Sequence, residues 1–135
     1  MDHVKAVLAG AEALDRWRRD HAGARLDLAG ADLSGKDLSG LNLGNAILDH
    51  AVLRGAKLRE ADLSQATLLR SDLPGADLTR AALWRTSFAG ANMRNADLSG
   101  AMLYRTDFRD ADMTGTKLAG VTPLKVIWPH TRVIS

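Results

Sequence analysis

A five-residue repeat constrains this chain more than any other feature of its sequence. From Leu26 to Gly120, 19 pentads follow one another without insertion or deletion. A five-residue period matches neither the two-residue period of a β-strand nor the period of about 3.6 residues of an α-helix. Neither element could keep one face inward over this length, so the backbone must turn once in every pentad.

Each position of the pentad has its own composition, which separates inward-facing from outward-facing side chains. The third position holds 15 Leu, two Phe and two Met, with no polar residue, and is the predicted core position. The first position is mainly Ala and is also predicted to point inward, into tighter space. Asp or Asn is common in the second position and Gly in the fifth, which favours turns and positive φ. We expect the second, fourth and fifth positions to face water.

The pentads carry many acidic side chains, but their spacing does not indicate chemistry. Because Asp recurs in the second position on every part of the repeat, we interpret it as a turn-forming residue that bonds to its own backbone. The members of this set are Asp27, Asp32, Asp37, Asp62, Asp72, Asp77, Asp97, Asp107 and Asp112. The four histidines are scattered, and no nucleophile elbow, phosphate loop or dinucleotide fingerprint occurs. We therefore expect no enzyme, no catalytic residue, no metal site and no cofactor.

The motif Ala-Asp-Leu-Ser-Gly, found at residues 31–35 and 96–100, resembles the consensus of the pentapeptide-repeat family. This resemblance implies an all-β solenoid, a right-handed parallel β-helix of quadrilateral cross-section with one pentad per side and four per coil. Residues 81–88 are echoed at 101–108, an independent period of 20 residues that such a coil would stack directly. Residues 26–120 would then form just under five coils.

The segments on either side of the repeat are predicted to close its ends. In residues 1–25, apolar residues at spacings of three and four predict one capping α-helix from Asp2 to about His21, with Asp2 as N-cap, Gly23 as its stop, and Leu14 and Trp17 as the plug. Residues 121–135 form an apolar C-terminal segment that either caps the open end or mediates a homodimer through it. Its candidate contact residues are Leu124, Ile127, Trp128, Val133 and Ile134.

One group of outward positions differs from the rest. Trp84-Arg85 and Tyr104-Arg105 occupy the fourth and fifth positions of pentads that lie 20 residues apart. Trp, Tyr and Arg dominate binding hot spots, so these four residues are the predicted partner-binding site. The competing interpretation is a structural role, in which the aromatic rings stack on each other or are covered by the C-terminal segment.

These observations favour a non-enzymatic protein-interaction scaffold whose partner the sequence does not identify. Some members of the family are DNA-mimicking inhibitors or protectors of gyrase. This chain, however, is short, and arginines interrupt its acidic positions; its net charge is +2 and its pI about 9.3. The sequence is also compatible with a nucleic-acid-binding module or a structural module without activity, although we do not expect nucleic acid as the main partner. It contains no apparent secretory signal and no apolar run of membrane-spanning length, so we expect a cytoplasmic protein and no membrane partner.

Overall fold

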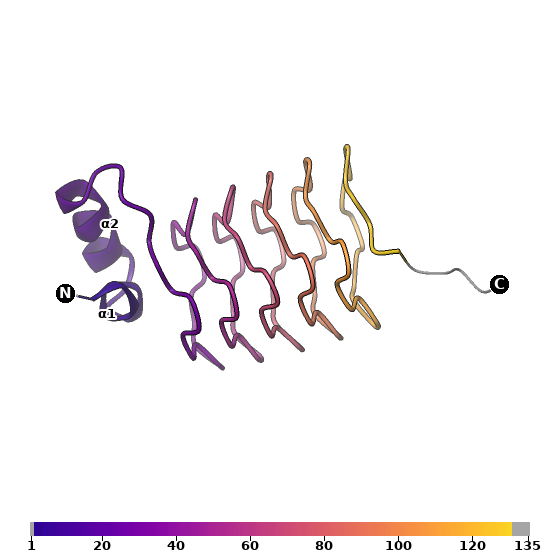
Figure 1. Cartoon of the computed structure of the whole chain (residues 1–135), viewed down its shortest axis with the longest axis horizontal. Coiled ribbons are helices and arrows are strands. Elements are labelled where there is room, and N and C mark those ends of the chain that lie inside the picture. Colours follow the sequence, from indigo (N-terminus) through magenta and orange to yellow (C-terminus); the bar gives the residue numbers. More distant parts are fainter. Residues whose placement is uncertain (1, 131–135) are drawn as a thin grey trace.

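The computed structural model describes residues 2–130, which form two short helices followed by a stack of similar coils (Figure 1). The helices lie at the N-terminal end of the stack, and the chain leaves at the opposite end. Val133 and Ile134, two of the predicted C-terminal contact residues, lie outside the described residues.

The N-terminal cap consists of α1, His3–Leu8, and α2, Ala11–Asp20. The prediction of one continuous helix is therefore wrong. Gly10 has φ of 100°, a value that an α-helix cannot accommodate, and it separates the two helices. Asp2 does cap α1, because its side chain accepts a hydrogen bond from the Lys5 amide at 2.8 Å. Gly23 also has positive φ, but it lies beyond the end of α2.

The two helices bury their apolar side chains against the first coil. Leu14 and Trp17, the predicted plug, are buried, and so are Ala6 and Val7 from α1. The break at Gly10 changes the direction of the chain, and Leu8 is left exposed although it belongs to the predicted apolar stripe.

The coils pair through isolated parallel β-bridges between residues 20 positions apart. These bridges run from Asp27–Ile47 to Asp97–Lys117, with one paired residue per pentad. In the described part of the chain each pairing is too short to form a longer named strand, because the backbone turns again within a few residues. A typical rung joins the Leu53 amide to the Asp72 carbonyl at 2.7 Å.

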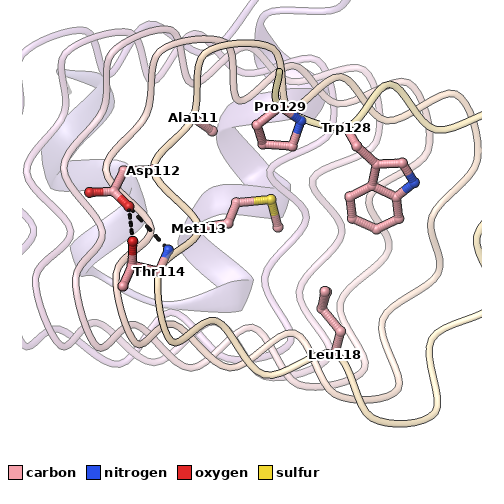
Figure 2. A pocket seen from close by; sticks show the side chains of 7 residues that line it. All are labelled: Ala111, Asp112, Met113, Thr114, Leu118, Trp128 and Pro129. Carbon is pink, nitrogen blue, oxygen red and sulfur yellow. Dashed lines mark hydrogen bonds between the residues drawn. The ribbon is translucent and has the colours of Figure 1, made fainter. Parts of the chain in front are cut away.

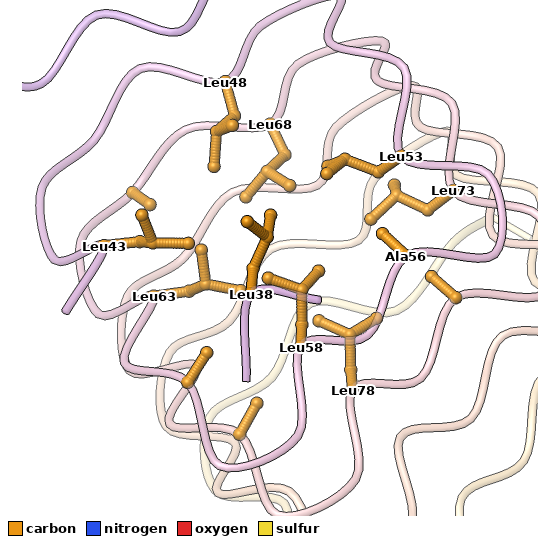
Figure 3. Packing of buried hydrophobic residues seen from close by; sticks show 14 of the residues in the cluster. Leu38, Leu43, Leu48, Leu53, Ala56, Leu58, Leu63, Leu68, Leu73 and Leu78 are labelled. Atoms are coloured by element: carbon orange, nitrogen blue, oxygen red, sulfur yellow. The ribbon is translucent and has the colours of Figure 1, made fainter. Parts of the chain in front are cut away.

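The core is a set of leucine ladders in the third position of the pentad (Figure 3). Leu38, Leu58 and Leu78 lie one above another in successive coils and are almost completely inaccessible to water. Ala in the first position is buried beside them. Where Thr replaces Ala, its hydroxyl is satisfied internally; Thr86 Oγ1 donates to the Leu63 carbonyl at 2.7 Å.

The outward positions build the turns as predicted. Asp32 shows the recurring pattern, because its carboxylate accepts hydrogen bonds from the backbone amide of Ser34 at 3.1 Å and from its hydroxyl at 2.7 Å. The residue in the fifth position of each pentad has positive φ, whether it is Gly or a larger residue. These turns hold the side chains of the second and fourth positions on the outer surface.

The first coil has no preceding coil, and three side chains take its place. The Asp27 amide donates to His3 Nδ1 at 2.6 Å. Arg18 donates to the carbonyls of Asn42 and Gly44, and Arg25 donates to the carbonyl of Asn45. Partial burial of the Arg18 guanidinium lowers its pKa, against the nearby carboxylates, which raise it. The cap thus satisfies backbone groups as well as covering apolar surface.

Beyond Gly120 the regular pairing is interrupted and then resumes. Leu124 pairs with Tyr104, and Ile127 pairs with Asp107 at the usual offset of 20. The interruption falls at Pro123, which cannot donate a backbone hydrogen bond. The C-terminal segment therefore begins as a partial further turn of the solenoid.

Candidate functional site

One side of the solenoid brings together the four residues predicted to bind a partner. Trp84 and Arg85 lie on one rung, and Tyr104 and Arg105 lie on the next. The Arg85 amide donates to the Tyr104 carbonyl at 2.7 Å, which places the two pairs side by side. The next rung continues the column, since the Arg105 amide donates to the Leu124 carbonyl at 3.0 Å.

The same side exposes more apolar surface than the four predicted residues provide. Trp84 is 49% exposed, Met102 45% and Leu124 57%. Tyr104 lies among them and is partly buried. We call this surface the aromatic–arginine face. Its members are Trp84, Arg85, Met102, Tyr104, Arg105, Leu124 and Lys125.

Arg105 and Tyr104 form the most closely coupled pair on the face. Arg105 Nε donates to the Tyr104 hydroxyl at 3.1 Å, and the guanidinium carbon lies 5.6 Å from the centre of the phenol ring. The hydrogen bond from Arg105 and its positive charge lower the pKa of Tyr104, with further contributions from Lys125 and Arg85. Three cations therefore act on one hydroxyl.

The cations of the face differ from most arginines elsewhere on the coils. Within residues 2–130, five ion pairs are formed: Arg54–Asp72, Arg59–Asp77, Arg80–Glu60, Arg94–Asp112 and Arg109–Asp107. In this part of the chain, Arg85, Arg105 and Lys125 take part in none of them. The face therefore carries positive charge that the described residues leave without an ion-pair partner.

The face is confined to the C-terminal half of its side. On the earlier rungs the corresponding fourth and fifth positions hold Gly44-Asn45 and Ser64-Gln65. Met102 and Lys125 escaped the sequence prediction. The 20-residue period places Lys125 in the column of Arg85, but Pro123 obscured the register there, and Met102 resembled an ordinary second-position residue.

The C-terminal end of the solenoid is only partly covered (Figure 2). A pocket of about 420 Å³ lies there, lined by Ala111, Asp112, Met113, Thr114, Leu118, Trp128 and Pro129. Ile127 and Trp128, both predicted contact residues of this end, are 46% and 40% exposed. Leu124, predicted for the same role, lies instead on the aromatic–arginine face.

The acidic positions do not converge on a chemical site. Their carboxylates are engaged in local turns, as at Asp112, which accepts from the amide and hydroxyl of Thr114 at 3.0 and 2.6 Å. Among residues 2–130, no group of three or more His, Asp or Glu side chains is placed to hold a metal ion. Over the same range, neither helix is long and apolar enough to cross a membrane.

The 20-residue pairing and the inward leucine ladders define a parallel β-helix repeat protein. The sequence profile of pentapeptide repeats matches residues 27–65, 46–85, 56–94 and 85–120, with eight copies. The chain belongs to the pentapeptide-repeat family. Its solenoid is accordingly a right-handed quadrilateral β-helix.

Solved structures of pentapeptide-repeat proteins resemble the chain over part of its length. A protein from the thylakoid lumen of Arabidopsis thaliana is 38% identical, over 65% of this chain and 65% of that protein, with a TM-score of 0.47. HetL from Nostoc, involved in regulating heterocyst differentiation, is 29% identical over 74% of this chain and 57% of its own, with a TM-score of 0.38. Another Nostoc protein is 32% identical over 71% and 76%, with a TM-score of 0.40.

These TM-scores are low, so the family assignment rests on the repeat sequence. The chain spans 65% and 57% of the length of the first two proteins. No curated protein matches the chain.

Proposed function

We propose that this protein is a non-enzymatic scaffold that binds a protein partner through the aromatic–arginine face. The observation that carries the proposal is the exposure of three large apolar side chains, Trp84, Met102 and Leu124, on adjacent rungs of one side. Such groups gain free energy when a partner covers them, and clustered exposed apolar surface marks interaction sites.

The fold suits this role because it holds the face rigidly. Backbone hydrogen bonds of 2.7 and 3.0 Å fix the rungs of Arg85, Tyr104 and Leu124 relative to one another. A preorganised surface loses little conformational entropy on binding. Trp, Tyr and Arg are also the residue types that contribute most in binding hot spots.

Several finer expectations belong to the same proposal. We infer a body of just under five coils, since 19 pentads at four per coil precede the C-terminal segment. We expect the protein to act in the cytoplasm and without catalysis of its own. DNA mimicry of the gyrase-modulating kind fits poorly, because the unpaired arginines of the face would repel a DNA-binding surface.

Affinity capture from the native host tests the proposal when three versions of the protein are compared. Trp84→Ala with Tyr104→Ala removes both aromatic rings, and Ala already occupies the fourth position at Ala29 and Ala89. The control, Arg54→Gln with Arg94→Gln, changes the same pentad position on another side. We expect a protein captured by the wild type and the control to be lost from the aromatic variant. If every captured protein is retained by a folded aromatic variant, the site assignment is wrong.

The C-terminal end supports a second candidate function, self-association into a homodimer. The observation that favours it is the partly covered end, where Trp128 is 40% exposed beside a pocket that also exposes Met113 and Leu118. A second copy could cover this surface by the same end in a two-fold arrangement.

Light scattering across a range of protein concentrations tests the homodimer. Ile127→Glu places a charge on the exposed end, whereas Leu69→Glu places one on a side of the solenoid where the leucine is 38% exposed. We expect a dimer for the wild type and Leu69→Glu, and a monomer for Ile127→Glu. A wild-type monomer at every concentration would rule the homodimer out.

A further inference from the structure

A column of three cations runs along the edge of the aromatic–arginine face. Arg85, Arg105 and Lys125 occupy the same position on successive rungs, and all three have positive φ, between 53° and 56°. Rungs of a parallel β-structure are about 4.8 Å apart, so the column follows the solenoid axis over roughly 10 Å.

The cations of this column are not neutralised within residues 2–130, as five arginines elsewhere on the coils are. Their charges reach a common point, because all three lower the pKa of Tyr104. The second-position residues beside them also change along this side. Asp62 gives way to Ala82 and then to Met102, so the acidic group found on the earlier rung is absent from the later ones.

An apolar column runs beside the cations. Trp84, Tyr104 and Leu124 follow one another on consecutive rungs, and Met102 widens the apolar strip next to Tyr104. A ligand complementary to both columns must carry negative charges along one edge and large apolar groups along the other.

We propose that the partner contacts this face with an acidic protein segment that also carries large apolar side chains and lies along the solenoid axis. This inference rests on the proposed function and adds the chemistry of the partner. Its apolar side chains cover Trp84, Met102 and Leu124, while its carboxylates face Arg85, Arg105 and Lys125. The binding site therefore extends to the last described rung of the solenoid.

A nucleic acid fits the same surface less well. Nucleic-acid affinity comes largely from phosphate contacts, and only three cations are available here. Bases stack on the aromatic rings of Trp84 and Tyr104, but the aliphatic side chains of Met102 and Leu124 offer no stacking plane. Apolar side chains of a protein segment cover all four residues.

The experiment is a selection of random 12-residue displayed peptides on the full-length protein. Enriched peptides are synthesised with a fluorescent label, and their Kd is measured by anisotropy at low and high salt. The variants are Arg85→Gln with Arg105→Gln, Trp84→Ala with Tyr104→Ala, and the control Arg54→Gln with Arg94→Gln. Gln is compatible with the cation column, because Gln65 occupies it one rung earlier with φ of 62°. A 12-nucleotide oligodeoxythymidine serves as the nucleic-acid probe.

We expect enriched peptides with net negative charge and at least two large apolar residues. Removing the two arginines should weaken binding roughly 3- to 10-fold, since each exposed ion pair contributes up to about 1 kcal/mol. Removing both aromatic rings should weaken binding more than about 10-fold, because the rings supply the buried anchors of the contact. The control variant should change Kd less than about twofold, and high salt should weaken wild-type binding.

The outcomes separate this inference from the proposed function. Neutral or basic peptides that the aromatic variant fails to bind would overturn the acidic partner and leave the face as a protein-binding site. Unchanged affinity in the arginine variant would do the same. Equal binding of the peptides by the aromatic variant would show that the face itself is wrongly assigned. An empty selection, or tighter binding of the oligonucleotide, would overturn the inference.

Discussion

The indole ring of Trp128 stacks on the phenyl ring of Phe108, with 5.5 Å between ring centres and 9° between ring planes. Phe108 stacks in turn on Phe88, at 5.3 Å and 7°. Trp128 thus continues an internal ladder beyond the regular pentads. The C-terminal segment extends the solenoid at this point, while the pocket beside it leaves the rest of the end open.

This ladder predicts graded effects of truncation on stability. Phe108→Ala should lower the free energy of unfolding by about 3–5 kcal/mol, because the ring is fully buried. Trp128→Ala should cost less, about 1–2 kcal/mol, because the side chain is partly open to water. Urea unfolding measures both, with Leu124→Ala as an exposed control. An equal loss for Trp128→Ala and Phe108→Ala would contradict the observed ladder.

The N-terminal cap predicts a local effect of removing His3. The ring accepts the hydrogen bond of the Asp27 amide and lies 4.7 Å from the Trp17 ring. His3→Ala should lower the free energy of unfolding by about 1 kcal/mol and speed hydrogen exchange at the Asp27 amide. His50→Asn, which changes a histidine at a turn of the solenoid, is the control. Unchanged exchange at Asp27 in His3→Ala would show that the cap does not use this bond.

Two glycines with nearly the same backbone conformation predict different costs of an added methyl group. Gly30 and Gly115 have φ of 69° and 71°. At Gly30 a Cβ atom would meet open space, whereas at Gly115 it would collide with the side-chain oxygen of Asn95. Gly30→Ala should cost about 1 kcal/mol from backbone strain alone, and Gly115→Ala should cost more unless Asn95 moves.

Thermal unfolding of the two variants measures this difference. In Asn95→Ala the collision partner is removed, so adding Gly115→Ala to that background should cost no more than Gly30→Ala does in the wild type. A cost at Gly115 that persists in the Asn95→Ala background would contradict the steric explanation.

The turn aspartates predict a loss of stability in acid. Hydrogen bonds from the hydroxyl and amide of Ser34 lower the pKa of Asp32 below its ordinary value of 3.8. The pKa of Asp97 and of Asp112 is lowered in the same way, by Ser99 and by Thr114. Because the folded-state pKa lies below the unfolded one, this stabilisation is present above pH 3.8 and is lost as the pH falls through the folded-state value.

Thermal unfolding between about pH 7 and pH 2 should therefore show Tm falling most steeply below about pH 4. Asp32→Asn keeps a hydrogen-bond acceptor in the turn, as Asn42 does in its own pentad, but removes the titration. Its Tm should fall less steeply in acid than that of the wild type. An identical slope would show that this carboxylate does not contribute.

The repeat made the interior predictable from sequence. Leu58 and Leu78 lie in one ladder because the period of 20 residues brings every fourth pentad to the same place. The turn role of Asp32 was predictable for a similar reason, since the bond is local and repeats in each pentad. Where every unit obeys the same packing rule, one correct interpretation extends to the whole body.

The ends of the solenoid do not repeat, and there the prediction was weaker. Gly10 divides the cap although the apolar spacing continues across it, because spacing alone does not report backbone φ. The bonds from His3 and Arg18 to the first coil depend on how the helices dock, which no local pattern encodes. Pro123 hid the register that places Lys125 beside Arg105.

Photo-crosslinking from the aromatic–arginine face tests the central claim most directly. A photoreactive phenylalanine analogue replaces Met102, whose side chain is 45% exposed and lies near Tyr104 in sequence and on the face. The control carries the analogue at Val52, two pentads from the Asp62 pentad along the chain and therefore on the opposite side of a four-sided coil. Both proteins are irradiated in extracts of the native host. We predict a crosslinked protein from position 102 that is absent from position 52 and is lost when Trp84 and Tyr104 are changed to Ala. Crosslinks from position 52 alone, or no crosslink from position 102, would contradict the account.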